Sequence, residues 1–240
     1  MTVLDVSRMN SIRETAARAS ADNDNNPNGW SQSIADPMKM LACFPALQIK
    51  SGYILRAYQF KEGGNGNGFV WAMPIDADFP QPEDCPTQVG RFLRPPKPPQ
   101  SLDQLMDAIE GDDTPWSYFS ASIFSREASE FGAMWHGCQW STHSLLGTDP
   151  WQCDPDAKDR RKRQALASGK ADEWTWNADR PETWGPTYSE QGDIVTITFH
   201  TFSGLAQESI FRFTDTFHKG RFNFATQEET IALGPHGYIF

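Results

Sequence analysis

The sequence predicts an α+β fold that is mostly β, with a curved antiparallel sheet or barrel-like meander and two short helices packed outside it. Segments in which apolar and polar residues alternate recur from about residue 41 onward, and turn-forming stretches separate them. Aromatic residues are abundant, with 9 Trp, 16 Phe and 5 Tyr among 240 residues. Half of the Phe residues lie from Phe199 onward, where the alternation is strongest, so we expect a meander there with one buried face.

The N-terminal residues, 1–30, are predicted to form a flexible arm ahead of a single aromatic-rich domain over 41–240. Residues 3–20 have a loose helical pattern without a strong apolar stripe. Residues 21–29 are polar and rich in Asn, which is typical of a connector. The arm fits docking on a partner, and it also fits an ordinary frayed terminus.

A β-hairpin is predicted where the alternating segments 47–60 and 69–73 flank the glycine-rich run 63–68. A phosphate-binding glycine loop leads from a strand into a helix, whereas both flanks of this run have the pattern of strands. Asn-Gly pairs supply the positive φ angles that hairpin turns need. The run is therefore interpreted as a hairpin with a wide, flexible tip.

A proline-rich connector is predicted over 74–99, because proline cannot donate a hydrogen bond to a sheet. Its last part, Arg-Pro-Pro-Lys-Pro-Pro at 94–99, favours a polyproline II helix. Such a helix can dock in an aromatic groove of a partner or serve as a stiff spacer. Both roles remain open at this point.

The two predicted helices cover 101–111 and 154–170. The first has a capping box formed by Ser101 and Gln104, and Gly111 suits its C-terminal cap. The second contains a run of basic residues, which fits either a solvated helix or contact with an acidic partner. Strands are predicted over 116–125, 131–146, 193–202, 208–213, 221–224 and 229–233.

Composition narrows the class of protein. The formal net charge of −10 argues against a general nucleic-acid surface. Apolar stretches are too short to span a membrane, and the N-terminus does not have the pattern of a secretory signal. The four cysteines have uneven spacing, without a C-x-x-C pair. A soluble, acidic, cytoplasmic protein is expected.

One segment holds residues that could carry chemistry, namely His136, Cys138 and His143. On an extended strand, His136 and Cys138 share one face. A metal ion would need further ligands, so no metal site is predicted and no cofactor is identified. Cys138 could act as a nucleophile activated by a histidine, although no Gly-x-Ser-x-Gly elbow is present. These three residues are the candidate catalytic residues if the protein is an enzyme.

Tryptophans suggest a binding surface. Trp174 and Trp176 share one face if they lie on a strand, and paired indoles can stack on a sugar, a base or another ring. The alternative is that they fill the core. The candidate ligand-binding residues are Trp135, Trp140, Trp151, Trp174, Trp176 and Trp184.

These observations favour a ligand-binding or accessory module with an aromatic-lined pocket for an apolar or aromatic small molecule, or with a surface for a protein partner. One alternative is a hydrolase-type or metal-type enzyme that uses His136 with Cys138 or His143. Another is a subunit of a larger complex that docks through its N-terminal arm and proline stretch. The sequence leaves the oligomeric state open.

Overall fold

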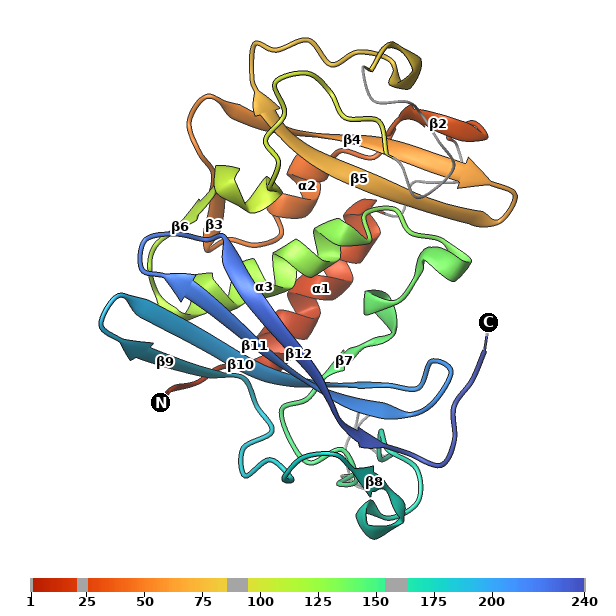
Figure 1. Ribbon diagram of the computed structural model, residues 1–240, viewed down its shortest axis with the longest axis vertical. Coiled ribbons are helices and arrows are strands. Elements are labelled where there is room, and N and C mark those ends of the chain that lie inside the picture. The colour runs from red at the N-terminus through yellow and green to blue at the C-terminus, as the bar shows by residue number, and fades with distance from the viewer. Residues whose placement is uncertain (1, 21–25, 86–94, 154–163, 240) are drawn as a thin grey trace. The chain divides into compact units, whose positions relative to one another are not determined.

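The computed structural model describes residues 2–20, 26–85, 95–153 and 164–239, and strands outnumber helices among them (Figure 1). The chain divides into two compact units. Unit 1 comprises Met1–Arg8, Thr142–Thr216 and Phe224–Phe240, and unit 2 comprises Met9–Ser141 and Phe217–Asn223. The predicted α+β, mostly β fold class is confirmed.

Unit 1 is built on a curled, antiparallel, seven-stranded sheet (Figure 1). The strand order is β1-β9-β10-β11-β12-β8, and β7 pairs with the second half of β10. The strands are β1 (Thr2–Val3), β7 (Ser144–Leu145), β8 (Thr175–Trp176), β9 (Thr187–Gln191), β10 (Ile194–Ser203), β11 (Ser209–His218) and β12 (Phe224–Leu233).

The predicted C-terminal meander is confirmed by the burial pattern of β10. Val195, Ile197 and Phe199 are fully buried, whereas Thr196 and Thr198 between them are partly exposed. Side chains alternate across a strand, so one face of the sheet is apolar and the other is polar. The strand predicted over 229–233 is the second half of β12, whereas residues 221–223 of the strand predicted over 221–224 precede β12 and are not in a strand.

Unit 2 combines helices with two small antiparallel sheets. In the larger sheet, β4 lies between β2 and β5, and in the smaller sheet β3 pairs with β6. The strands are β2 (Gly29–Gln32), β3 (Leu47–Ile49), β4 (Tyr53–Glu62), β5 (Asn65–Pro74) and β6 (Ile109–Gly111). The helices are α1 (Val6–Ser20), which belongs to unit 2 from Met9 onward, α2 (Pro37–Leu41) and α3 (Pro115–Ser129).

The predicted hairpin is present as β4 and β5, but its tip is narrow. Glu62 pairs with Asn65, which leaves a two-residue turn at Gly63 and Gly64. Gly63 has a φ of 59°, a conformation that glycine adopts without strain. The run from Asn65 onward belongs to the strand, where a Cβ at Gly68 would lie 2.5 Å from the carbonyl oxygen of Phe131. The wide tip predicted over 63–68 is therefore wrong.

The strand predicted over 116–125 is also wrong, because this segment belongs to helix α3. Thr114 caps the helix by accepting a hydrogen bond from the backbone N–H of Ser117, and Pro115 occupies the first turn. Every side chain from Ser117 to Phe124 is buried. A helix that is buried all round lacks the amphipathic period, which explains the misleading pattern.

The helix predicted over 101–111 is not formed. The backbone N–H of Leu102 donates to the carbonyl of Ala72 on β5, and the hydroxyl of Ser101 donates to Pro98 rather than capping a helix. A short 3₁₀ turn then leads into β6, which pairs with β3. Contacts with neighbouring strands therefore replace the intrahelical hydrogen bonds that the capping pattern implied.

The remaining predicted segments are described in part. Within the predicted arm, α1 is helical and its Met9 and Ala16 are fully buried, while the flexibility of the arm stays a prediction. In the proline stretch, Pro96 and Pro98 are buried. The basic run of the second predicted helix and the middle of the proline connector lie outside the described residues. No helix among the described residues has the length and apolar character needed to cross a membrane.

Candidate functional site

The candidate site is a pair of hollows that share Arg212 on β11 of unit 1. The first has a volume of about 550 Å³ and is lined by Trp176, Asn177, Ala178, Asp179 and Arg212. The second has a volume of about 310 Å³ and is lined by Thr198, Arg212, Thr214, Gln227 and Glu229. We call the two hollows together the Arg212 cleft. The residues that line the second hollow come from three strands. Thr198 lies on β10, Arg212 and Thr214 lie on β11, and Gln227 and Glu229 lie on β12.

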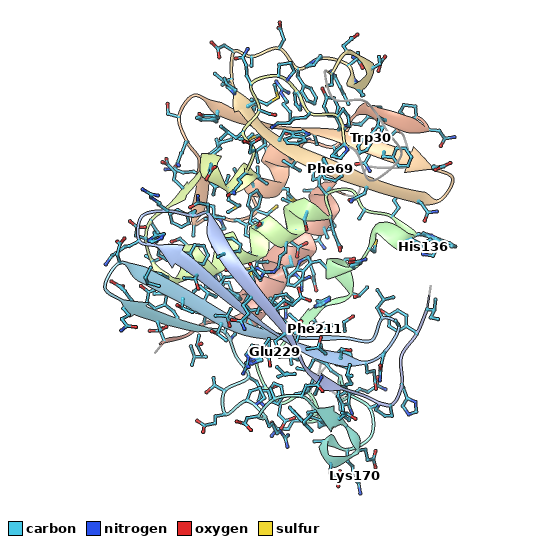
Figure 2. All side chains as sticks on the ribbon, viewed as in Figure 1. Trp30, Phe69, His136, Lys170, Phe211 and Glu229 are labelled. Carbon is cyan, nitrogen blue, oxygen red and sulfur yellow. The ribbon has the colours of Figure 1, made fainter. Side chains whose placement is uncertain are left out.

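An ion pair lies at the centre of the Arg212 cleft. Nη2 of Arg212 is 2.5 Å from Oε2 of Glu229, whose position is labelled in Figure 2. Each side chain is about one-third exposed. An exposed ion pair contributes only about 0 to 1 kcal/mol to stability. The ion pair therefore mainly orients the two side chains. The neighbouring strands β11 and β12 hold the Arg212 guanidinium and the Glu229 carboxylate side by side.

Four tryptophans form a packed cluster beside the cleft. The ring centre of Trp151 lies 5.0 Å from that of Trp174, 5.9 Å from Trp176 and 6.3 Å from Trp184. Trp174 and Trp184 are buried, and the cluster packs on Ile210 and Ile231 of the sheet. Trp174 and Trp184 therefore serve the core of unit 1. Of the six predicted ligand-binding tryptophans, Trp176 is the one that lines the cleft.

Two backbone contacts fix the indoles of this cluster. Nε1 of Trp176 donates to the carbonyl of Ala171 at 2.9 Å, and Nε1 of Trp174 donates to the carbonyl of Ser168 at 3.0 Å. The guanidinium of Arg180 lies 5.3 Å from the ring centre of Trp151 and 5.9 Å from that of Trp176. The wall of the cleft at Trp176 is thus held in one orientation.

His200 on β10 lies buried near the base of the cluster. Its Nδ1 is 3.3 Å from the carbonyl oxygen of Trp184, which only accepts, so Nδ1 carries a hydrogen and donates a hydrogen bond to it. The two rings meet edge to face with their centres 5.8 Å apart. Burial lowers the pKa of His200 to about 4, and the nearby charge of Arg212 acts in the same direction. The hydrogen bond to Trp184 opposes this shift. His200 is therefore neutral at pH 7.

The segment that holds His136 and Cys138 is not the strand predicted over 131–146. It consists of two 3₁₀ turns followed by the two-residue strand β7. The carboxylate of Glu130 explains this local structure, because it accepts hydrogen bonds from three backbone N–H groups. The donors are those of Gln139, Trp140 and Ser141. These N–H groups are consequently unavailable to a sheet.

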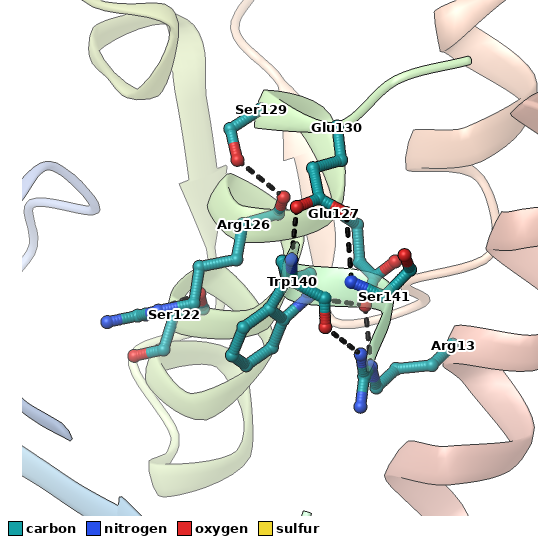
Figure 3. A network of polar contacts seen from close by, with 8 residues as sticks. All are labelled: Arg13, Ser122, Arg126, Glu127, Ser129, Glu130, Trp140 and Ser141. Carbon is teal, nitrogen blue, oxygen red and sulfur yellow. Dashed lines mark hydrogen bonds and ion pairs between the residues drawn. The ribbon is translucent and has the colours of Figure 1, made fainter. Parts of the chain in front are cut away.

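Trp140 is fixed by a polar network within unit 2 (Figure 3). Its Nε1 donates to Oε1 of Glu127 at 2.8 Å, and the same oxygen is 2.6 Å from Nε of Arg13. The guanidinium of Arg13 also lies 4.7 Å from the Trp140 ring centre, and that of Arg126 lies at 5.6 Å. The indole N–H and a ring face of Trp140 are therefore engaged by its own chain.

The three candidate catalytic residues have different surroundings. His136 is exposed in the first turn (Figure 2). Burial raises the pKa of the Cys138 thiol, against the lowering effect of a hydrogen bond from Ser141, so the reactive thiolate is disfavoured. His143 belongs to unit 1, where its Nδ1 is 2.8 Å from Oγ1 of Thr201. Among the described residues, no group of three His, Cys, Asp or Glu side chains is arranged to bind a metal ion.

Trp135 stands apart from the other tryptophans. Its side chain is 63% exposed, and its φ of 45° is in the left-handed region that L residues rarely adopt. The ring centre of His136 lies 6.3 Å away. Trp135 belongs to unit 2, and it does not line the Arg212 cleft of unit 1.

Sequence reasoning missed the polar residues of the cleft. One signal was available in the sequence: Arg212 lies between two phenylalanines of a predicted strand. Because side chains alternate, Arg212 must lie on the face of the sheet opposite to theirs. Pairing with Glu229 depends on the register of β11 and β12, which the sequence does not specify. The cleft therefore emerges only once the strands are aligned.

The chain was compared with protein-family models, curated proteins and solved structures, and none of them matches it. The function must therefore be inferred from the side chains of the site.

Proposed function

We propose that this protein is a binding module that holds a small molecule in the Arg212 cleft. The observation that carries the proposal is the junction of two hollows at one guanidinium. The two hollows, of about 550 and 310 Å³, are open to solvent and mostly polar, so a ligand would lie against the surface of the sheet. Strands β10 to β12 supply most of the polar lining, and side chains on strands are positioned more accurately than those on loops.

The alternative of an enzyme that uses His136, Cys138 and His143 has less support. A nucleophilic cysteine needs a lowered pKa and a base within hydrogen-bonding distance. Burial raises the pKa of Cys138, and its thiol forms a hydrogen bond with Ser141 rather than with a histidine. Binding in unit 1 is accordingly better supported than catalysis at Cys138.

A screen by ligand-observed NMR tests the proposal. The probes are neutral monosaccharides, aromatic carboxylates and aromatic amines, offered to the full-length protein and to the variants Arg212→Ala and Trp176→Ala. We expect at least one probe class to bind, and both substitutions to weaken it at least tenfold. Arg56→Ala, which alters an exposed arginine of unit 2, is the matched control and leaves binding unchanged. Binding that none of the variants affects would contradict the proposal.

A further inference from the structure

We infer that the ligand of the Arg212 cleft is a neutral polyhydroxylated molecule, namely a carbohydrate. This inference rests on the proposed binding function and names its ligand class. The lining of the cleft combines one indole, two side-chain amides, two carboxylates, one guanidinium and two threonine hydroxyls. A sugar offers a group for each of these, because its hydroxyls donate and accept hydrogen bonds and its C–H face can contact the indole.

The charges of the cleft favour a neutral ligand. Arg212 attracts an anion, but Asp179 and Glu229 both line the cleft and repel it. A cation is attracted by the two carboxylates and repelled by Arg212, which borders both hollows. An uncharged molecule avoids either repulsion, so charge does not select against it.

The polarity of the cleft excludes a purely apolar ligand. Trp176 and Ala178 are its apolar lining residues, and the rest are polar or charged. An apolar molecule would remove water from the Arg212 guanidinium and the Glu229 carboxylate without replacing the lost hydrogen bonds, which is costly. A hydroxyl group both donates and accepts, so one sugar hydroxyl can accept from Arg212 and donate to Glu229.

Geometry at the ion pair suits vicinal hydroxyl groups. Guanidinium and carboxylate groups are planar and can each make two parallel hydrogen bonds. Arg212 has five N–H donors, and Nη2 is the nitrogen that donates to Glu229. The remaining donors, together with the hydroxyls of Thr198 and Thr214 on the neighbouring strands, offer several hydrogen bonds along the cleft.

Trp176 supplies the apolar contact that a sugar ring needs. One face of a pyranose carries C–H groups, which are attracted to the electron-rich face of an aromatic ring. The hydrogen bond from Nε1 to the Ala171 carbonyl and the packing of Trp151 hold the indole in place. A sugar in the cleft can then contact the indole and the polar groups around Arg212 at once.

The test is titration of the ¹⁵N-labelled full-length protein, followed by the indole N–H signal of Trp176 and the Nε–H signal of Arg212. The probes are D-glucose, D-galactose, D-mannose and N-acetyl-D-glucosamine, with indole-3-acetate and benzyltrimethylammonium as the anionic and cationic comparisons. For a ligand of this size we expect a Kd of about 1 mM for at least one sugar. Arg212→Gln and Trp176→Phe weaken it at least tenfold, while Trp30→Phe in unit 2 does not.

Salt distinguishes the ligand classes. Binding of a neutral sugar changes less than twofold between 50 and 500 mM NaCl, whereas binding of a charged probe at Arg212 weakens with salt. If a charged probe shifts the Trp176 and Arg212 signals and no sugar does, the carbohydrate inference is overturned while the binding function stands. If no probe shifts either signal, both are overturned. Circular dichroism confirms that each variant is folded.

Discussion

His200 makes the stability of unit 1 depend on pH in a way that can be calculated. The side chain is 5% exposed, and its pKa of about 4 in the folded protein compares with an ordinary value of 6.5. Because the folded-state pKa is lowered, the unfolded chain binds more protons between these values. The stability that neutral His200 confers is therefore complete above pH 6.5 and is lost as the pH falls toward 4.

The magnitude follows from the two pKa values. A difference of one pH unit in pKa corresponds to about 1.4 kcal/mol, so complete protonation of His200 removes about 3 kcal/mol from the free energy of unfolding. At pH 5 the unfolded form is almost fully protonated and the folded form is not, which gives a loss of about 2 kcal/mol relative to pH 7.

The assay compares urea unfolding at pH 7 and pH 5 for the unaltered protein and for His200→Asn. An asparagine amide can still donate to the Trp184 carbonyl, but it does not titrate. We expect the unaltered protein to lose about 2 kcal/mol more than His200→Asn over this interval. The control His136→Gln, at an exposed position, keeps the full dependence on pH. Equal losses in the unaltered protein and in His200→Asn would refute the reasoning.

Three further predictions concern the fold. Gly68→Ala lowers the free energy of unfolding by about 2 kcal/mol through overpacking, whereas Gly64→Ala, where a Cβ meets nothing within 4 Å, leaves the urea midpoint nearly unchanged. Glu130→Gln lowers stability by about 1 to 2 kcal/mol in the same assay, because a neutral amide offers one acceptor oxygen to three N–H groups. In the native protein, a thiol reagent that absorbs on reaction modifies exposed Cys153 rapidly and buried Cys85 only on unfolding.

Strand alternation was sufficient to predict β10 and part of both β11 and β12 of unit 1, but not β1 or β9, because alternation is a local property of the chain. In β10 each buried residue follows a partly exposed one over several positions, and the turns on either side are short. The helix α3 shows where the same reasoning fails. Its side chains are buried on every side, so no period remains in the sequence, and the Thr-Pro start was the better guide.

The turns around Cys138 could not be predicted for a different reason. Their backbone N–H groups donate to Glu130, which follows the end of α3, and this arrangement depends on where the helix ends. Once the strand is replaced by turns, the shared face that was expected for His136 and Cys138 no longer exists. The prediction that His136 and Cys138 act together assumed an extended backbone. The hydrogen bonds to the Glu130 carboxylate prevent that conformation.

The contrast between Trp140 and Arg212 explains why the abundance of tryptophan was a poor guide to the site. Trp140 donates its single N–H to Glu127 and presents a ring face to Arg13, so its own chain uses what it can offer. Arg212 has five donors and a neighbour, Glu229, that engages one of its nitrogens in the described residues. A side chain can recognise a ligand only through donors, acceptors or ring faces that the rest of the protein does not already engage. By this criterion Arg212 on the polar face of the sheet is a better centre for a site than the tryptophans, because Trp176 too donates its single N–H within the chain, to Ala171, and offers a ligand only ring surface.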